Sequence, residues 1–318
     1  MNVSDAAELG RRLAQRDRSA APAALNLLEE RGPGAAERAD ALMAEISPAK
    51  LGSEVPGMIL GITGPPGAGK STLLSALIAL WRQRGKSVAV LAIDPSSKRS
   101  GGSLLGDRAR MAVDSRDADV LVRSTATATR LGGLAPATRE AAIALAAAFD
   151  VVIVETVGVG QSETDISELA DTVVVIVQPA SGDALQFIKS GVMEIPDILV
   201  VTKADLGAVA KRAARDLKAA LRALGSKTPV LQVSSIAPVT GVDELVDAAE
   251  EHFASQDLSS RRADLRRLAA LDAFTVENGE KGLRSLGGRR AAVKLLAEQD
   301  PALGHRQLRA LLDEHAEV

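Results

Sequence analysis

Residues 64–71 read Gly-Pro-Pro-Gly-Ala-Gly-Lys-Ser, a pattern that matches the phosphate-binding loop (P-loop) of proteins that bind nucleoside triphosphates. The apolar run 58–62 before the loop predicts a buried strand, and the apolar-rich stretch 71–80 after it predicts a helix packed on a sheet. This order matters because a glycine-rich turn between strand and helix lets backbone N–H groups and the helix N-terminus surround a β-phosphate. The chain is therefore expected to bind a nucleoside triphosphate.

Within this loop, two side chains have predicted roles of their own. Lys70 is expected to reach the β- and γ-phosphates, and the Ser71 hydroxyl is expected to bind Mg²⁺. The residues predicted to contact the phosphates are Gly64, Pro65, Pro66, Gly67, Ala68, Gly69, Lys70, Ser71 and Thr72.

The chain around the loop alternates short β-rich runs with helical patterns, from Met58 to about His252. The runs 151–154 and 173–177 are apolar without alternation, as in strands covered on both faces, so the pattern predicts an α/β fold with a doubly wound, mostly parallel sheet. The predicted strands are 58–63, 87–93, 119–123, 151–155, 173–177, 198–202 and 230–233.

Helical patterns without strands flank this region on both sides. We expect an N-terminal helical extension at 1–54, a triphosphate-binding domain at 55–254, and a C-terminal helical arm at 255–318. Neither composition nor pattern decides whether the arm binds a partner or caps the sheet.

Composition narrows the function classes. The 318 residues carry a formal net charge of −3, which argues against nucleic acid as the main partner. The absence of cysteine excludes disulfides and thiolate metal sites, and His252, His305 and His315 are expected on helix surfaces. With no apolar run long enough to span a membrane and no signal-peptide core, we expect a cytoplasmic protein.

The segment Thr202-Lys203-Ala204-Asp205, directly after an apolar run, predicts recognition of guanine. The Asp205 carboxylate can accept hydrogen bonds from the base N1–H and 2-amino groups, which adenine cannot supply, and the Lys203 stem can lie along the base. The usual first residue of this motif is Asn, so Thr202 can replace only part of its hydrogen bonding. Ser234, Ser235 and Ile236 follow the next predicted strand, where a second base-contacting loop is expected.

Acidic residues at two further strand ends are candidates for binding the metal and its waters. Glu155 ends the run 151–154, and Asp94 ends the run 87–93. Gly158 can offer its N–H to the γ-phosphate, and Gln161 can either orient water or lie on the surface.

Two further polar segments follow predicted strands. The glycine-rich stretch 94–108 suits a lid, in which Asp107 is a candidate Mg²⁺ partner and Arg108 a candidate for phosphate charge. In the second stretch, 178–189, Asp183 is the expected N-cap of a helix.

Taken together, five stretches within residues 55–205 resemble a known family: GPPGAGKST, AIDPSS, GGSLLGDRARM, ETVGVGQSE and GDALQFIKSGVMEIPDILVVTKAD. The family is the MeaB/ArgK-type G-protein chaperones of adenosylcobalamin-dependent acyl-CoA mutases, which includes the methylmalonic aciduria type A protein and has a SIMIBI-type P-loop GTPase domain. The two ends of the chain match this family only in kind, as helical extensions.

The resemblance implies that GTP hydrolysis gates the loading of intact cofactor onto a mutase and the removal of damaged cofactor. Cobalamin would stay with the partner, the segment 178–189 would give Asp183 and Lys189 a signalling role, and the C-terminal arm would form a homodimer. Besides Thr202, the chain departs from the family pattern at Ala184, where a second acid is common, and at Arg108, where Lys is common.

From these residues we expect Mg²⁺-dependent hydrolysis of GTP, in which Lys70, Asp107, Glu155 and Gln161 are the candidate catalytic residues. The candidate metal-binding residues are Ser71, Asp94, Asp107 and Glu155. Because none of them is a convincing general base, turnover without a partner should be slow.

Two alternatives remain. A nickel-delivery GTPase would usually carry Cys or His near the P-loop, which this chain lacks. A small-molecule kinase or transport-linked ATPase would prefer ATP.

Overall fold

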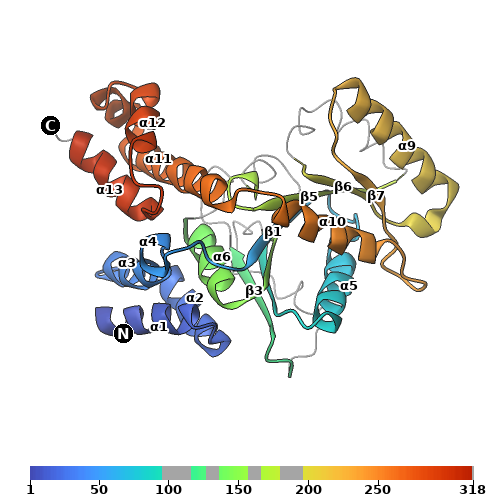
Figure 1. The fold of residues 1–318 in the computed structure, drawn as a ribbon, viewed down its shortest axis with the longest axis horizontal. Helices are drawn as coiled ribbons and strands as arrows, with labels where there is room; N and C mark the ends of the chain where they lie inside the picture. Colours follow the sequence, from blue (N-terminus) through green and yellow to red (C-terminus); the bar gives the residue numbers. More distant parts are fainter. Residues whose placement is uncertain (95–115, 127–135, 157–165, 180–195, 317–318) are drawn as a thin grey trace, which may run out of the picture. The chain divides into compact units, whose positions relative to one another are not determined.

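The computed structural model describes residues 1–94, 116–126, 136–156, 166–179 and 196–316 (Figure 1). The chain divides into two compact units. One unit holds the sheet and consists of 58–138 and 149–255, and the other is helical and consists of 1–57, 139–148 and 256–318. The N- and C-terminal segments thus belong to one helical unit.

The sheet has seven strands, all parallel, in the order β3-β2-β4-β1-β5-β6-β7. This confirms the predicted doubly wound α/β fold, and the observed strand limits lie within about three residues of the predicted ones. The strands are β1 (Met58–Thr63), β2 (Val88–Asp94), β3 (Val120–Ala126), β4 (Val151–Thr156), β5 (Thr172–Val177), β6 (Ile198–Val201) and β7 (Val230–Gln232).

Helices cover both faces of this sheet (Figure 1). Helices α5 (Lys70–Gln83) and α10 (Val242–Ala254) pack on one face, where their apolar residues share a core with alternate residues of the strands. Helix α9 (Ala208–Ala223) lies on the opposite face and follows the short 3₁₀ turn η3 (Ala204–Leu206). Two-sided cover explains why the central strands are apolar at every position.

The helical unit contains the two chain ends and most of α6. Its helices are α1 (Val3–Ala14), η1 (Arg18–Ala20), α2 (Ala21–Glu29), α3 (Ala35–Glu45), α4 (Pro48–Leu51), α6 (Pro136–Ala148), α11 (Leu258–Ser285), α12 (Arg289–Ala297) and α13 (His305–Ala316).

Helices α11, α12 and α13 have an apolar core of their own, which includes Phe274, Leu296 and Leu312. Helix α11 is also tied to the segment before β1. The Arg262 guanidinium donates to the carbonyls of Val55 and Gly57, 2.5 and 2.7 Å away.

The expectation that all three histidines lie on helix surfaces is wrong for His305. Its side chain is buried, and its Nε2 atom lies 2.9 Å from Oε1 of the buried Glu140. Arg306 donates to both oxygens of the same carboxylate. Sequence periodicity cannot reveal such a cluster, because the partners are 165 residues apart.

In the described residues, no helix is long and apolar enough to cross a membrane.

Candidate functional site

The P-loop lies at the carboxyl end of β1, between the neighbouring strands β4 and β5. Gly64 follows β1 directly, and a Cβ atom there would lie 2.6 Å from the Ile176 carbonyl oxygen of β5. Gly67 and Gly69 have φ angles of +76° and +90°, a conformation that side chains rarely adopt. The loop therefore needs glycine at all three positions. At Gly64 a side chain would clash with β5, and at Gly67 and Gly69 the backbone conformation disfavours any other residue.

The Lys70 side chain folds back into the mouth of this loop. Its ammonium group donates to the carbonyls of Gly64 and Pro65 over 2.8 and 3.2 Å, and the residue is buried. Lys70 and Ser71 also form the first turn of α5, so the free N–H groups and positive end of the helix face the same place as the ammonium group. This convergence of positive charge and N–H donors fits a phosphate chain.

A second loop is bonded directly to the P-loop. The Thr202 hydroxyl, at the end of β6, donates to the Ala68 carbonyl over 2.7 Å, and Thr202 is buried. The Gln178 amide, oriented to satisfy both of its neighbours, donates to the Gly67 carbonyl and accepts from the Lys203 ammonium, each over 3.1 Å. The two predicted nucleotide-binding segments are thus joined by one direct hydrogen bond and by a link of two hydrogen bonds through Gln178.

The loop that starts at Thr202 has an unusual backbone. Lys203 has a φ of +53°, uncommon for a residue other than glycine, and such residues cluster at functional sites. The N–H of Ala204 donates to the Val233 carbonyl over 3.1 Å, which ties this loop to the end of β7. Asp205 is exposed there, at the start of η3.

The segment after β7 completes this corner of the site. The buried Ser234 has its hydroxyl 3.2 Å from both Oδ1 of Asp205 and the Ile236 carbonyl, so the Asp205 carboxylate has a fixed neighbour. A short antiparallel bridge between Ser234 and Thr240 closes the loop, in which Ile236 is 54% exposed. The structure therefore brings Asp205 and Ser234 together and places Ser235 and Ile236 in the same loop.

On the other side of the P-loop, Glu155 and Asp94 stand near the carboxyl ends of β4 and β2. Glu155 is buried. Its register partners on the two neighbouring strands, Ile62 and Ala92, both belong to the core under α5. The Glu155 side chain therefore lies on the face of the sheet that α5 covers. The Glu155 carboxylate and the Ser71 hydroxyl are both hard oxygen donors, and such donors suit Mg²⁺.

The described residues contain no group of three or more His, Cys, Asp or Glu side chains that could hold a metal by themselves. Mg²⁺ commonly binds through one or two protein oxygens together with substrate phosphates and waters, so the donor pair Ser71 and Glu155 fits that ion.

Three buried threonine hydroxyls also lie near the carboxyl ends of strands: Thr63, Thr125 and Thr156. None of them has a hydrogen-bond partner in the described part of the chain. Ile93 is the register partner of both Thr125 and Thr156, so those two hydroxyls belong to one row across β3, β2 and β4. Buried hydroxyls without partners are rare, and each of them calls for an explanation.

Six predicted site residues lie outside the described residues: Asp107, Arg108, Gly158, Gln161, Asp183 and Lys189.

The family model described as methylmalonyl-CoA mutase-associated GTPase MeaB matches residues 21–279. The chain belongs to the MeaB family. A MeaB-type protein is a P-loop GTPase, which agrees with the joined phosphate and base loops and confirms the resemblance seen in the sequence.

Curated relatives extend this match along the chain. A Mycobacterium tuberculosis protein named "Probable GTPase" is 39% identical over 312 residues, which cover 92% of this chain and 90% of the relative. A Caenorhabditis elegans protein named "Methylmalonic aciduria type A homolog, mitochondrial" is 39% identical over 265 residues, covering 78% of this chain and 66% of the relative. Among solved structures, one described as an LAO/AO transport system kinase has a TM-score of 0.67 and 29% identity, and covers 100% of this chain and 99% of that chain.

Gln178 is the residue of this MeaB-type site to which sequence reasoning assigned no role. Only its position in the sequence could have indicated a role: Gln178 is the first polar residue after β5, and β5 pairs with β1, the strand that leads into the P-loop. Nothing in the sequence identified Gly67 and Lys203 as its two partners.

Proposed function

We propose that this protein uses the binding and hydrolysis of GTP to gate the loading of intact adenosylcobalamin onto a B12-dependent acyl-CoA mutase and to protect that mutase. The family match over residues 21–279, to a GTPase described as mutase-associated, supports this proposal. The name of the Caenorhabditis elegans relative points the same way. Cobalamin would be carried by the mutase rather than by this chain.

The single observation that carries the nucleotide part of the proposal is the bond between Thr202 and Ala68. It holds the base loop against the P-loop, so one nucleotide would contact both. Asp205 would accept hydrogen bonds from N1–H and the 2-amino group of guanine, and the Lys203 stem would lie along the base face. Ser234 would hold the Asp205 carboxylate, while Ser235 and Ile236 would border the base.

At the phosphate end, the loop amides and Lys70 would stabilise negative charge on the transferring γ-phosphoryl group. The Ser71 hydroxyl and Glu155, with Asp94 at the neighbouring strand end, would hold Mg²⁺ and its waters. When bound, Mg²⁺ would neutralise part of the negative charge of the phosphates. The chain's own residues would orient the phosphates so that water can attack in line.

Hydrolysis without a partner should be slow, since neither Lys70 nor Glu155 is suited to abstract a proton from water. Asp107 and Gln161 are the remaining candidates, and their roles rest on the sequence. A partner could supply the missing group, as in other P-loop GTPases.

Coupling to the mutase would use Arg108, Asp183 and Lys189. Their segments follow strands that end at the nucleotide site, so the presence of the γ-phosphate could bias them.

The C-terminal helices α11, α12 and α13 would form a homodimer. Val276 on α11 and Val293 on α12 are 85% and 50% exposed, and such apolar side chains are suited to an interface. Sedimentation velocity of the wild type and of a Val276→Glu variant tests this part, because only a dimer built on this surface would become monomeric.

The alternative function is a small-molecule kinase or transport-linked ATPase. The related solved structure described as an LAO/AO transport system kinase is the reason to test it. Equilibrium titration with fluorescent GTP and ATP analogues separates the two. We expect GTP to bind at least about 100-fold more tightly, because adenine would cover the Asp205 carboxylate without supplying the two hydrogen bonds that guanine donates to it. A preference for ATP would refute it.

The chaperone part needs its own experiment. Candidate apo-mutases would be incubated with adenosylcobalamin, with and without this protein and GTP, and cofactor loading followed by absorbance. We expect one mutase to load in a GTP-dependent manner and to accelerate GTP hydrolysis. If no mutase changes either quantity, the chaperone proposal fails although GTP binding is intact.

A further inference from the structure

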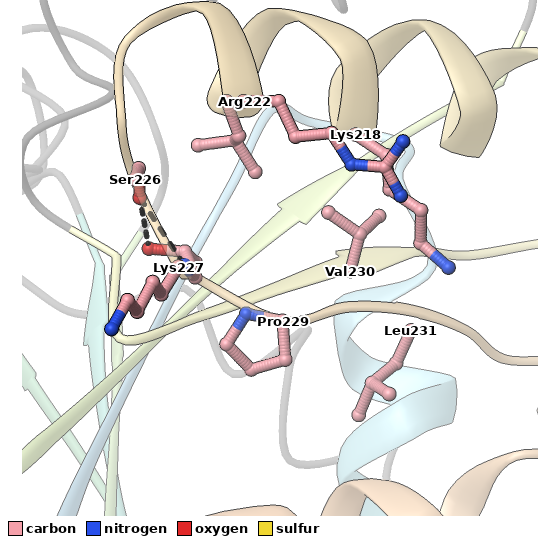
Figure 2. A pocket seen from close by; sticks show the side chains of 9 residues that line it. Lys218, Arg222, Ser226, Lys227, Pro229, Val230 and Leu231 are labelled. Atoms are coloured by element: carbon pink, nitrogen blue, oxygen red, sulfur yellow. Dashed lines mark hydrogen bonds between the residues drawn. The ribbon is translucent and has the colours of Figure 1, made fainter.

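The end of the sheet unit away from the nucleotide loops carries a pocket between α9 and β7 (Figure 2). It has a volume of about 420 Å³ and lies beside the first residues of β7, whereas the base loop follows the last ones. Leu221, Pro229, Val230 and Leu231 give it an apolar floor. A pocket of this size is at the small end of ligand sites.

The rim of this pocket is basic. Lys218 and Arg222 extend from α9 and Lys227 from the loop before β7, and all three are exposed (Figure 2). No carboxylate is among the residues that line the pocket. The three cations therefore surround an apolar floor without an acidic group to neutralise them.

The positive charge continues along α9, beyond the pocket. Lys211, Arg215, Lys218 and Arg222 are spaced by four, three and four residues, which places them in one stripe on the helix. The stripe spans about 16 Å at a rise of 1.5 Å per residue. In the described part of the chain, none of these four residues forms an ion pair, and the one acid of α9, Asp216, faces Arg212.

The position of the stripe follows from the buried face of α9. That face consists of Ala210, Ala214, Leu217 and Leu221, and each cation of the stripe is the next residue along the chain. A step of one residue turns about 100° around the helix, so the stripe runs along the flank of α9. Lys218 and Arg222 line the pocket together with residues of β7, so this flank of α9 lies beside β7. Strand β7 is the edge strand of the sheet and pairs with β6.

Charge on this surface is opposite to that of the whole chain. Residues 208–231 contain six Lys and Arg and one Asp, a formal charge of +5, whereas all 318 residues sum to −3. The rest of the chain therefore has a formal charge of −8. A concentrated positive field on an acidic protein steers acidic partners to one place.

We propose that this surface, the α9 stripe with its pocket, binds an acidic segment of a partner protein that carries an apolar side chain. The apolar side chain would occupy the floor at Leu221 and Leu231, and the acidic residues beside it would pair with Lys218, Arg222 and Lys227. The remaining acids would follow the stripe toward Lys211. A small anion in the pocket could not reach the whole stripe, and a nucleic acid would not use the apolar floor.

The test uses the full-length protein and two fluorescein-labelled peptides. One is a short glutamate-rich peptide with a central Leu-Phe pair, and the other has Gly-Gly in place of that pair. Fluorescence anisotropy at low salt should show binding of the first peptide and at least about fivefold weaker binding of the second. Raising NaCl should weaken both, because exposed ion pairs are screened.

Charge reversal locates the binding site. The double variant Lys218→Glu/Arg222→Glu should bind the Leu-Phe peptide at least about tenfold more weakly. Lys281→Glu/Arg290→Glu is the matched control, since it makes the same charge change at two exposed cations of the helical unit and should leave binding unchanged. Lys218→Ala/Arg222→Ala keeps helix-forming residues and should give an intermediate loss, so a folding defect from the glutamates is separable.

Four results would overturn the proposal. They are the absence of peptide binding, equal weakening by the control pair, binding of a single-stranded oligonucleotide as tight as that of the peptide, and self-association of the wild type that the charge reversal abolishes. The third result would mean a nucleic-acid surface, and the fourth would mean that a second copy of the chain occupies it. GTP binding should be unchanged in every variant, which separates this proposal from the proposed function.

Discussion

The hydroxyl of Thr202 donates to the carbonyl of Ala68 over 2.7 Å, so the base loop is bonded to the P-loop by the side chain that replaces the usual Asn. A threonine hydroxyl has one proton to donate, whereas an Asn amide has two. The one proton of Thr202 goes to the P-loop, and the Gln178 amide adds a second link between the loops through Gly67 and Lys203.

Replacing Thr202 with valine should weaken GTP binding about 5- to 20-fold. The shape stays almost the same, but the buried Ala68 carbonyl loses its donor, which costs about 1–2 kcal/mol. Thr275→Val is the matched control, because its hydroxyl bonds to the Leu271 carbonyl over the same 2.7 Å, within α11. Isothermal titration with GTP should show a loss only for Thr202→Val, and equal affinities of the two variants would contradict a role for the bond.

Asp205→Asn should exchange the base that the protein prefers. An Asn amide cannot accept two hydrogen bonds from guanine, but its N–H₂ group can donate to the 2-oxo group of xanthine. We expect GTP affinity to fall at least about 100-fold and xanthosine triphosphate affinity to rise. Competition binding with both nucleotides measures the exchange. Asp216→Asn on α9 removes the same charge away from the site and should alter neither affinity.

Gly64→Ala should abolish nucleotide binding and lower the free energy of unfolding by about 1–3 kcal/mol. The added Cβ would meet the Ile176 carbonyl oxygen at 2.6 Å, and backbone of a central strand cannot move aside cheaply. Gly225→Ala is a useful comparison, because its φ is +70° but no atom lies within 4 Å of the new Cβ. That variant should cost about 1 kcal/mol and keep GTP affinity. Denaturant unfolding and GTP titration test both.

The helical unit should lose stability in acid through Glu140. Burial by itself would raise the pKa of this carboxyl, but hydrogen bonds from His305 and Arg306 outweigh it and hold the pKa below its ordinary value of 4.5. The stabilisation is therefore complete above pH 4.5 and is lost as the pH falls through the lowered pKa.

The variant that tests this is Glu140→Gln, which should unfold about 2 kcal/mol more easily at pH 7, because His305 and Arg306 lose the buried carboxylate while Arg306 keeps its ion pair with Asp40. Its free energy of unfolding should also fall less than that of the wild type as the pH drops below 4.5. Glu298→Gln, an exposed control on the helical unit, should retain the wild-type free energy of unfolding at pH 7 and the wild-type loss of stability in acid. Urea unfolding across pH 7 to 4 measures the difference, and parallel pH profiles of wild type and Glu140→Gln would refute this role of Glu140.

Much of the sheet could be predicted because each central strand carries its own signal. Strands β4 and β5 are apolar at consecutive positions, and in a soluble protein only a strand covered on both faces does this. The P-loop and the base loop could be predicted for a similar reason, since the requirements for glycine, lysine and aspartate are local. The limits of β3 were predicted least well: the strand runs to Ala126, three residues beyond the predicted end, because polar residues in its second half give little pattern.

The residue types and their order along the chain define the chemistry that each segment can perform: a P-loop, a base loop and acidic strand ends in the order of a GTPase. Which of these groups touch depends on the fold, which brings Gln178 to Gly67 and Lys203, and Glu140 to His305 across 165 residues. The tertiary structure also gathered both chain ends into one helical unit and set the basic flank of α9 beside β7. The physical reason is that periodicity and turn chemistry act between neighbours in sequence, whereas partners distant in sequence are selected by the packing of the whole fold.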